Sequence, residues 1–293
     1  RYPRPCLSKA VYPVKKGDEE KIAQGMQRLS EEDKTFSFYT DGETHEQILS
    51  GMGETHLDVI VSKLKSKFGV DVVLKEPKVA YREAIRKKVK VQGKHKKQSG
   101  GHGQYGDVWI EFEPYDGQEL LFEEKIFGGS VPKNFHPAVE KGLRESAEHG
   151  VLAGYPVVGL KATLVDGSYH DVDSSEMSFK IAAGIAYREG LKQADPVILE
   201  PIGRLVVTVP DAMMGDIIGD ITRRRGQILG MTPTAETLQS IEADVPMAEM
   251  GSYATDLRSM TRGRGTFTFD FSRYADAPSA VAQKVIESAQ TSE

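Results

Sequence analysis

Cysteine is almost absent from this chain of 293 residues, and long apolar runs are absent altogether. The single cysteine, Cys6, rules out a disulfide framework and fits a reducing, cytoplasmic environment, where it would serve as a small buried apolar side chain. No apolar run approaches the roughly 18 residues of a membrane-spanning helix. The sequence therefore predicts a cytoplasmic protein with no membrane partner.

The sequence also lacks the motifs of common enzymes. It contains no G-x-x-x-x-G-K-[ST] phosphate loop, so it cannot bind or hydrolyse a nucleoside triphosphate in the usual way. The seven histidines show no H-E-x-x-H or Cys/His metal spacing, since "HEQIL" begins at His45 but ends at Leu49. No serine or cysteine lies in a recognisable nucleophile elbow. We expect no catalytic residue, cofactor or metal here, and an independent hydrolase or metal enzyme is the weaker alternative.

One glycine pattern does resemble a nucleotide-binding loop. Gly101, Gly103 and Gly106 form G-x-G-x-x-G. In a dinucleotide-binding fold a helix follows the last glycine, but residues 108–113 alternate apolar and polar side chains as a strand does, ending at Pro114. A protein kinase would also need H-R-D and D-F-G motifs, which the chain lacks. The pattern therefore predicts a flexible, glycine-rich hairpin loop.

The sequence before this loop is strongly cationic. Residues 84–106 contain no acidic side chain, whereas seven side chains carry positive charge: Arg86, Lys87, Lys88, Lys90, Lys94, Lys96 and Lys97. The whole chain has 38 basic and 43 acidic residues and a net charge of -5, so any nucleic-acid contact must be confined to patches. Lysines that protect a solvated edge strand are the simpler interpretation of such a run. The polar glycine-rich tip favours RNA.

Hydrophobic periodicity predicts an α+β fold in which one order of elements occurs twice. The first eighty residues indicate strand, helix, strand, strand, helix and strand, at residues 6–13, 18–31, 36–40, 47–49, 54–68 and 70–74. The same order returns from Leu205 to the alternating "TFTFDF", with Asp211 as the expected cap of its first helix. We therefore expect two ferredoxin-like βαββαβ domains flanking an elongated α/β domain.

The middle domain is expected to contain two helices. One follows Pro137, and the other carries Met177, Ile181 and Ile185 on its apolar stripe. Asp173 and Glu176 form a plausible capping pair for the second helix. His170, in the loop before it, is either a simple turn residue or a group that reaches RNA beside the glycine hairpin.

Six separated stretches, in order, resemble bacterial elongation factor G: "SGMGETHLDVIV", "KQSGGHGQYGDV", "GYPVVGLKATLVDGSYHDVDSSEMSFKIAA", "LEPI", "GDIIGDITRRRGQI" and "YATDLRSMTRGRGTFTFDF". The resemblance covers the last three of that factor's five domains. It implies a third domain at 1–78, a fourth at 79–200 with a returning helix at 277–289, and a fifth at 201–275. It also implies that Arg1 begins a piece of a longer protein, whose missing N-terminal domain would bind GTP and magnesium.

The resemblance implies a monomeric, ribosome-binding arm of a translational GTPase, which promotes translocation of tRNA and mRNA. Its partners would be ribosomal RNA, tRNA and mRNA at the decoding region, and the factor-binding centre of the large subunit. The tip that contacts RNA in the decoding region would comprise Lys96, Lys97, Gln98, Ser99, Gly100, Gly101, His102, Gly103, Gln104, Ser168, Tyr169, His170 and Asp171. Candidate contacts to large-subunit RNA are Arg223, Arg224, Arg225, Arg258, Arg262 and Arg264, although arginines near a helix end also complement its dipole.

Three departures from the family pattern keep an alternative open. His102 stands where the family usually has arginine, Thr55 replaces the leucine of "GELHL", and residues 263–266 read "GRGT" where "GRAS" is usual. Loss of a fixed charge at the tip leaves room for an elongation factor G paralogue that acts in ribosome recycling or ribosome protection.

Overall fold

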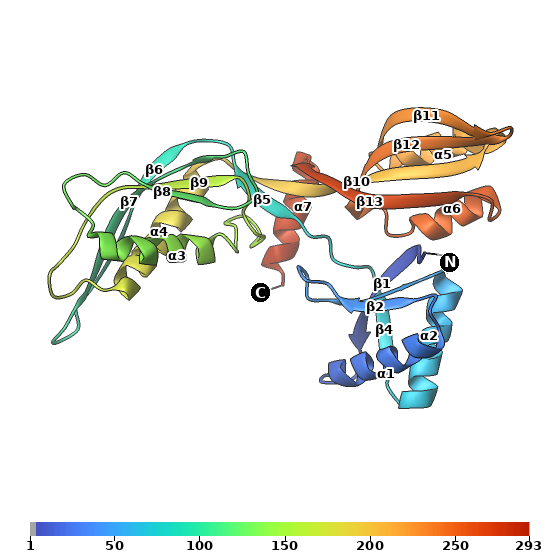
Figure 1. Ribbon diagram of the computed structural model, residues 1–293, viewed down its shortest axis with the longest axis horizontal. Coiled ribbons are helices and arrows are strands. Elements are labelled where there is room, and N and C mark those ends of the chain that lie inside the picture. The colour runs from blue at the N-terminus through green and yellow to red at the C-terminus, as the bar shows by residue number, and fades with distance from the viewer. Residues whose placement is uncertain (1–3, 293) are drawn as a thin grey trace. The chain divides into compact units, whose positions relative to one another are not determined.

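The computed structural model describes residues 4–292, so Arg1 lies outside the described residues. The chain divides into two compact units, residues 1–80 with 201–273 and residues 81–200 with 274–293. The helices and strands of both units are shown in Figure 1. The fold is α+β, as expected from the sequence.

The first part of unit 1 has the expected ferredoxin-like plan. Its elements are β1 (Leu7–Pro13), α1 (Glu19–Glu32), β2 (Ser37–Thr40), β3 (Gln47–Gly51), α2 (Glu54–Phe68) and β4 (Val72–Lys75). The strands form an antiparallel sheet in the order β2-β3-β1-β4. The predicted stripe of α1, Ile22, Met26 and Leu29, is buried in the core. Gly69 ends α2 in the left-handed conformation, with φ 66°, which glycine adopts without strain.

The second part of unit 1 repeats this plan. After β10 (Pro196–Pro210) come a 3-10 turn (Asp211–Met213), α5 (Met214–Arg223), β11 (Gln227–Ala235), β12 (Leu238–Pro246), a 3-10 turn (Met247–Glu249), α6 (Tyr253–Thr261) and β13 (Thr266–Asp276). The sheet order β11-β12-β10-β13 matches that of the first part. The alternating residues Leu205, Val207 and Val209 are fully buried.

Unit 2 is a sheet covered by two packed helices. Its elements are β5 (Arg82–Ile85), β6 (Val89–Lys97), β7 (Gln104–Pro114), β8 (Leu121–Glu124), a 3-10 turn (Lys133–Phe135), α3 (His136–Ser146), β9 (Leu160–Ser168), α4 (Glu176–Gln193) and the returning helix α7 (Ser279–Gln290). The sheet order is β6-β7-β9-β8, with β8 parallel to β9 and the other pairs antiparallel. Strand β5 pairs separately with the first residues of β10.

A buried carboxylate fixes the connection after α3. Glu83, on β5, is 2% exposed and accepts hydrogen bonds from the backbone N–H groups of Leu152, Ala153 and Tyr155 at 2.7–3.1 Å. Burial raises the pKa of this carboxyl, while the N–H donors act in the opposite direction. The turn is therefore organised around one side chain.

Several local expectations are wrong. Met177 of α4 is 59% exposed, and the buried face of α4 is formed mainly by Phe179, Tyr187, Leu191 and small residues between them. Ser175 and Ser178, not Asp173 and Glu176, make the capping box of α4. Asp211 begins a 3-10 turn and makes no capping hydrogen bond. Cys6 is only half-buried, and its Sγ donates to the carbonyl of Met52 at 3.3 Å.

Candidate nucleic-acid interface

The glycine-rich loop is the tip of a long antiparallel hairpin. Strands β6 and β7 pair from Val89 opposite Phe112 as far as Lys97 opposite Gln104, which leaves residues 98–103 as the connecting loop. Gly100 and Gly101 have φ values of 63° and 80°, where L side chains are strained. Every residue from Lys96 to His102 is exposed. The G-x-G-x-x-G pattern therefore serves a turn, as predicted.

A second loop, residues 168–174, is hydrogen-bonded to this hairpin. The Gly103 N–H donates to Asp173 Oδ1 at 3.1 Å, and the Tyr105 N–H donates to the Asp173 carbonyl at 2.9 Å. Ser174 Oγ in turn donates to the Tyr105 carbonyl at 2.9 Å. The structure thus brings together the two predicted segments of the tip, residues 96–104 and 168–171.

His170 is held by its own loop and still has one free ring nitrogen. Its Nδ1 accepts hydrogen bonds from the backbone N–H groups of Val172 and Asp173 at 3.3 and 3.2 Å. In the neutral ring the proton therefore lies on Nε2, which makes no hydrogen bond within residues 4–292. The side chain is 56% exposed. His170 can therefore donate from Nε2 to an acceptor outside the chain.

The other residues of the second loop differ in whether their side chains are free to contact a partner. Tyr169 is 47% exposed and Asp171 is exposed. Ser168 is half-buried, and its hydroxyl is shared between the Tyr105 hydroxyl and Asp107 Oδ2, each at 2.6 Å. Ser168 thus supports the hairpin, whereas Tyr169 and Asp171 face solvent.

Two glycines of the hairpin allow helix α4 to pack directly on its backbone. A Cβ atom at Gly93 would lie 2.0 Å from the Ala182 carbonyl oxygen, and one at Gly106 would lie 2.4 Å from the Ser178 carbonyl oxygen. No L side chain fits at either position without displacing the helix. The last glycine of the G-x-G-x-x-G pattern therefore has a packing role, and the hairpin is supported by a helix along one face.

The cationic segment, residues 86–97, has its positive charges paired with acids at Arg86 and Lys88 but not at Lys96 and Lys97. Lys88 lies 3.4 Å from Glu111 Oε2 and 3.7 Å from Glu113 Oε2, and Arg86 is paired with Asp276. Lys94 is placed 5.6 Å from the centre of the Tyr105 ring. By contrast, Lys96 and Lys97 make no ion pair with any residue from 4 to 292. Positive charge is therefore available at the exposed end.

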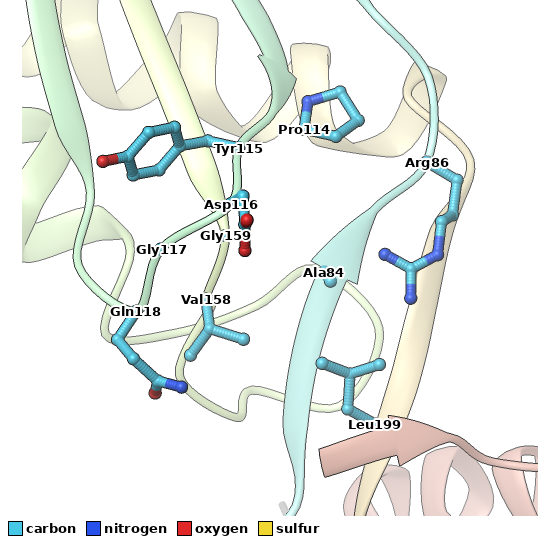
Figure 2. A pocket seen from close by; sticks show the side chains of 10 residues that line it. All are labelled: Ala84, Arg86, Pro114, Tyr115, Asp116, Gly117, Gln118, Val158, Gly159 and Leu199. Carbon is cyan, nitrogen blue, oxygen red and sulfur yellow. The ribbon is translucent and has the colours of Figure 1, made fainter. Parts of the chain in front are cut away.

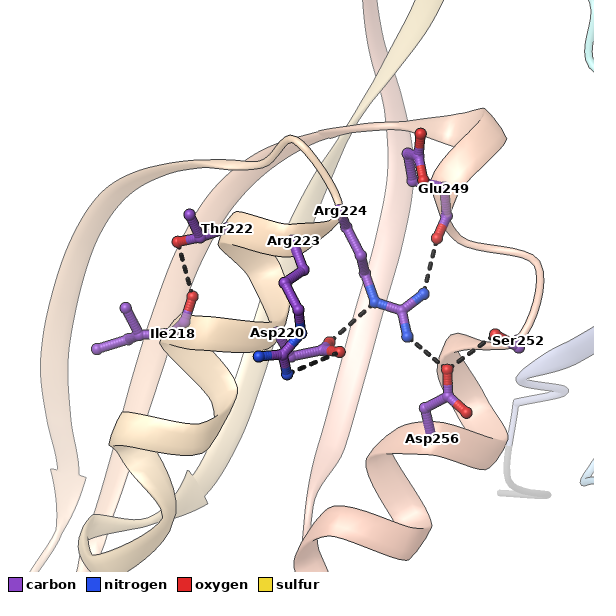
Figure 3. A network of polar contacts seen from close by, with 8 residues as sticks. All are labelled: Ile218, Asp220, Thr222, Arg223, Arg224, Glu249, Ser252 and Asp256. Carbon is purple, nitrogen blue, oxygen red and sulfur yellow. Dashed lines mark hydrogen bonds and ion pairs between the residues drawn. The ribbon is translucent and has the colours of Figure 1, made fainter.

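Arg224 is not an available RNA contact. Its side chain is 11% exposed and lies in the network of Figure 3, where Nε donates to Asp220 at 2.8 Å, Nη1 to the Glu249 carbonyl at 2.7 Å and Nη2 to Asp256 at 2.5 Å. Burial lowers the pKa of a guanidinium, but the bonds to Asp220 and Asp256 outweigh this effect, so the pKa of Arg224 is raised. The expectation for Arg224 is corrected because its side chain is nearly buried and each of its three nitrogens donates to a partner inside unit 1.

The other five arginines have distinct positions. Arg223, next to Arg224, is 72% exposed. Arg225 has φ 59° and donates to Glu249 at 3.1 Å, while Arg258 donates to the Met52 carbonyl at 3.1 Å within unit 1. Two exposed arginines directly follow α6: Arg262, in a left-handed conformation with φ 54°, and Arg264. Of the six candidates, three are exposed and make only long contacts or none among residues 4–292: Arg223, Arg262 and Arg264.

Another candidate feature is an open cavity of unit 2, shown in Figure 2. It is bordered by the turn Tyr115–Gln118 and by Arg86, whose guanidinium is already paired with Asp276. Within residues 4–292 no three His, Cys, Asp or Glu side chains gather in a way that could hold a metal ion. In the same residues no helix has the length and apolar character needed to cross a bilayer.

Sequence reasoning missed the residues that join the two loops. The sequence assigns Asp173 to helix capping, yet its carboxylate and its carbonyl both bind the hairpin. Tyr105 and Ser174 complete the connection through backbone and hydroxyl bonds. No local signal identifies such contacts, since the partners are about seventy residues apart in the chain.

Comparison with known proteins agrees with this architecture. Residues 2–76 match the family "Elongation Factor G, domain III", residues 77–195 match "Elongation factor G, domain IV" and residues 197–285 match "Elongation factor G C-terminus". The fold is similar to a crystal structure from Thermus thermophilus, with a TM-score of 0.88 and 43% sequence identity over 99% of this chain. The match spans 44% of that protein's length. The chain therefore belongs to the elongation factor G family and carries its domain III, its domain IV and its C-terminal region.

Proposed function

We propose that this chain is the ribosome-engaging part of a translational GTPase and that the tip of unit 2 contacts RNA at the decoding region to promote translocation of tRNA and mRNA. The observation that carries the proposal is the tip itself, where two loops are bonded together at the end of a helix-supported hairpin. Lys96, Lys97 and His170 offer cationic and hydrogen-bonding groups there. Such groups suit phosphate and base contacts.

The proposal assigns a positioning role to the chain and no chemical step. We propose that GTP and magnesium are bound by an N-terminal domain of the parent protein; the matches of this chain to domains III, IV and the C-terminus are compatible with that proposal. Arg223, Arg262 and Arg264 are the candidate contacts to large-subunit RNA, since their side chains are exposed. The expected setting is the cytoplasm, and the expected state is a monomer.

Sedimentation with ribosomes over a salt series tests the phosphate contacts. Replacing both Lys96 and Lys97 by glutamine should weaken binding and reduce the slope of log K against log salt by about 2, since each lysine on a phosphate contributes about 1. Lys88→Gln is the matched control, because Lys88 is already paired with Glu111 and Glu113. Equal slopes for the wild type and the double variant would remove these lysines from the interface.

A toeprinting time course with the full-length parent tests the role of His170. His170→Ala should slow mRNA movement while GTP hydrolysis continues, because the free Nε2 donor is lost. His149→Ala is the control, since His149 is also exposed and follows the C-terminal end of α3. Normal movement in His170→Ala would show that this side chain is dispensable.

A role in ribosome recycling or protection is the second candidate, and His102 is the residue that favours it. His102 is exposed at the tip, at the position where the family usually carries arginine. His102→Arg should increase translocation if the chain is an elongation factor weakened at this position. If the chain is a recycling or protection factor, the variant should lose that activity without gaining translocation.

A further inference from the structure

The loop between β8 and the 3-10 turn before α3 presents an aromatic ring to solvent. Phe127 is 93% exposed, the highest value among the large apolar residues of the described chain. It is followed by Gly128 and Gly129, whose φ values of 68° and 71° are left-handed. Ile126, just before it, packs against the core of unit 2. The backbone thus turns at the two glycines that follow Phe127, and the Phe127 ring remains in solvent.

The exposure of the Phe127 ring does not result from a loosely held loop. The Lys125 N–H donates to the Leu164 carbonyl at 2.8 Å, and the Ile126 N–H donates to Glu124 Oε2 at 3.0 Å. On the other side, Val131 is 1% exposed and its carbonyl is hydrogen-bonded to the His136 ring at 2.9 Å. Both ends of the loop are therefore fixed, and the Phe127 ring is exposed at a defined position.

The loop lies beside the tip described above. The Lys125 N–H donates to Leu164 in the middle of β9, and near the end of that strand the Val131 side chain packs so close to Gly167 that a Cβ atom there would lie 2.5 Å from it. Strand β9 ends at Ser168 and continues directly into the second tip loop. In Figure 1 the connection from β8 to α3 lies at the same end of unit 2 as the β6–β7 hairpin.

The charges around Phe127 favour a polyanion. Lys125 and Lys133 are exposed and make no ion pair within residues 4–292. Residues 125–133 contain no acid; of the two acids just before them, Glu123 lies 3.3 Å from Lys161 and the exposed Glu124 accepts the Ile126 N–H. The loop therefore offers an exposed flat ring that lies between two exposed lysines in the sequence, and aromatic rings with cations are the combination that binds single-stranded nucleic acid.

We propose that Phe127 stacks on an unpaired nucleobase of RNA while Lys125 and Lys133 contact its phosphates, so that residues 125–133 form a third loop of the interface. The proposal rests on the proposed function, because it adds a contact to the same RNA-binding end. An apolar pocket of a protein would also accept the phenyl ring, but it would gain nothing from the two lysines. The two partners differ in what they require of residue 127, since stacking needs a flat π face.

The test titrates the chain against a labelled oligoadenylate of about 12 nucleotides, followed by fluorescence anisotropy. Phe127→Ala should weaken binding roughly five- to hundredfold, the range expected when one stacked base is lost. Phe127→Leu should lose about as much, and Phe127→Trp should retain binding. Phe271→Ala is the control, since Phe271 is 54% exposed but lies in unit 1.

The tryptophan variant also gives a direct readout. The chain has one tryptophan, Trp109, so any quenching beyond that of the wild type on adding oligoadenylate reports on position 127. Wild-type affinity in Phe127→Ala, full affinity in Phe127→Leu, or absence of extra quenching in Phe127→Trp would each overturn the proposal.

Ribosome sedimentation separates this proposal from the function on which it rests. If the chain binds ribosomes through Lys96 and Lys97 but Phe127→Ala binds as the wild type does, the third loop is wrong and the proposed function stands. If the wild-type chain fails to bind ribosomes at all, the proposed function itself fails. If ribosome binding needs Phe127 while the oligoadenylate titration does not, the partner of the ring is a protein surface and the stacking proposal is overturned.

Discussion

Arg224 and Arg223 are adjacent in the sequence, and replacing each by methionine should have very different effects on unit 1. Methionine keeps the length of the aliphatic stem and removes the guanidinium. In Arg224→Met, Asp220 loses its main partner although its side chain is only 12% exposed. Removing one member of a buried ion pair typically costs about 3–5 kcal/mol. We expect about 3 kcal/mol, because Asp256 is 43% exposed and can be hydrated.

Arg223→Met is the matched control. Arg223 is 72% exposed, and its Nη2 is 3.9 Å from Asp220 Oδ1, a geometry worth at most about 0.5 kcal/mol. The difference between the variants is then about 2.5 kcal/mol, which corresponds to a roughly 70-fold change in the opening equilibrium. Because Trp109 lies in unit 2, its fluorescence does not report on this region. Amide hydrogen exchange of peptides from α5 and β12 is the suitable measurement.

Hydrogen exchange in Arg224→Met should be faster than in Arg223→Met by that factor, and exchange in Arg223→Met should be close to that of the wild type. Equal exchange in both variants would refute the view that the network of Figure 3 holds α5 and α6 together. It would also return Arg224 to the set of candidate RNA contacts.

Two further predictions concern packing and pH. Gly93→Ala should destabilise unit 2 by more than about 2 kcal/mol, since the new methyl group overlaps the Ala182 carbonyl. Gly184→Ala is the control: it lies within α4, has no neighbour closer than 3.5 Å, and should stabilise unit 2 by about 0.5–1 kcal/mol. Urea unfolding followed by Trp109 fluorescence compares the two variants. Hydrogen bonds from the Thr35 hydroxyl and from His56 lower the pKa of Asp33 to about 2. A carboxyl with a lowered pKa stabilises the folded state above its ordinary pKa, so this contribution is lost as the pH falls from about 4 to about 2. Asp33→Asn should flatten that dependence in urea unfolding followed by circular dichroism, with the exposed Asp58→Asn as control, and an unchanged profile would show that Asp33 does not contribute.

The elements with strong local signals are predicted well from the sequence. Helix α2 has the predicted bounds, because its apolar stripe is regular and Gly69 supplies a left-handed end. The two βαββαβ orders follow in the same way from periodicity, and both sheets have the strand order that this plan requires.

Helix α4 shows why other features could not be predicted. Its large apolar residues suggest a stripe through Met177, but small residues such as Ala182 and Ala186 form the face against the sheet, where Gly93 leaves room for them. A pattern based on apolar side chains cannot recognise close backbone packing. Strand β5 was missed for a related reason, since its pairing with β10 joins residues more than a hundred positions apart.

The candidate site was predictable as a location and not as a set of contacts. The composition of the two loops indicates the tip, whereas the availability of each side chain depends on distant partners. Arg223 and Arg224 illustrate this, because neighbouring positions on a helix point about 100° apart and only one faces α6. Which arginine is buried cannot be read from the letters "RRR".

The close approach of α4 to Gly93 and Gly106 has a mechanical consequence. A two-stranded ribbon alone bends easily across its thin direction, but a ribbon in contact with a helix backbone resists bending as a two-layer beam does. A force applied to the loop at residues 98–103 is then transmitted as compression along α4 instead of being dissipated in curvature of the strands. One added methyl group at either glycine would push α4 away from the β6–β7 hairpin and make the hairpin easier to bend.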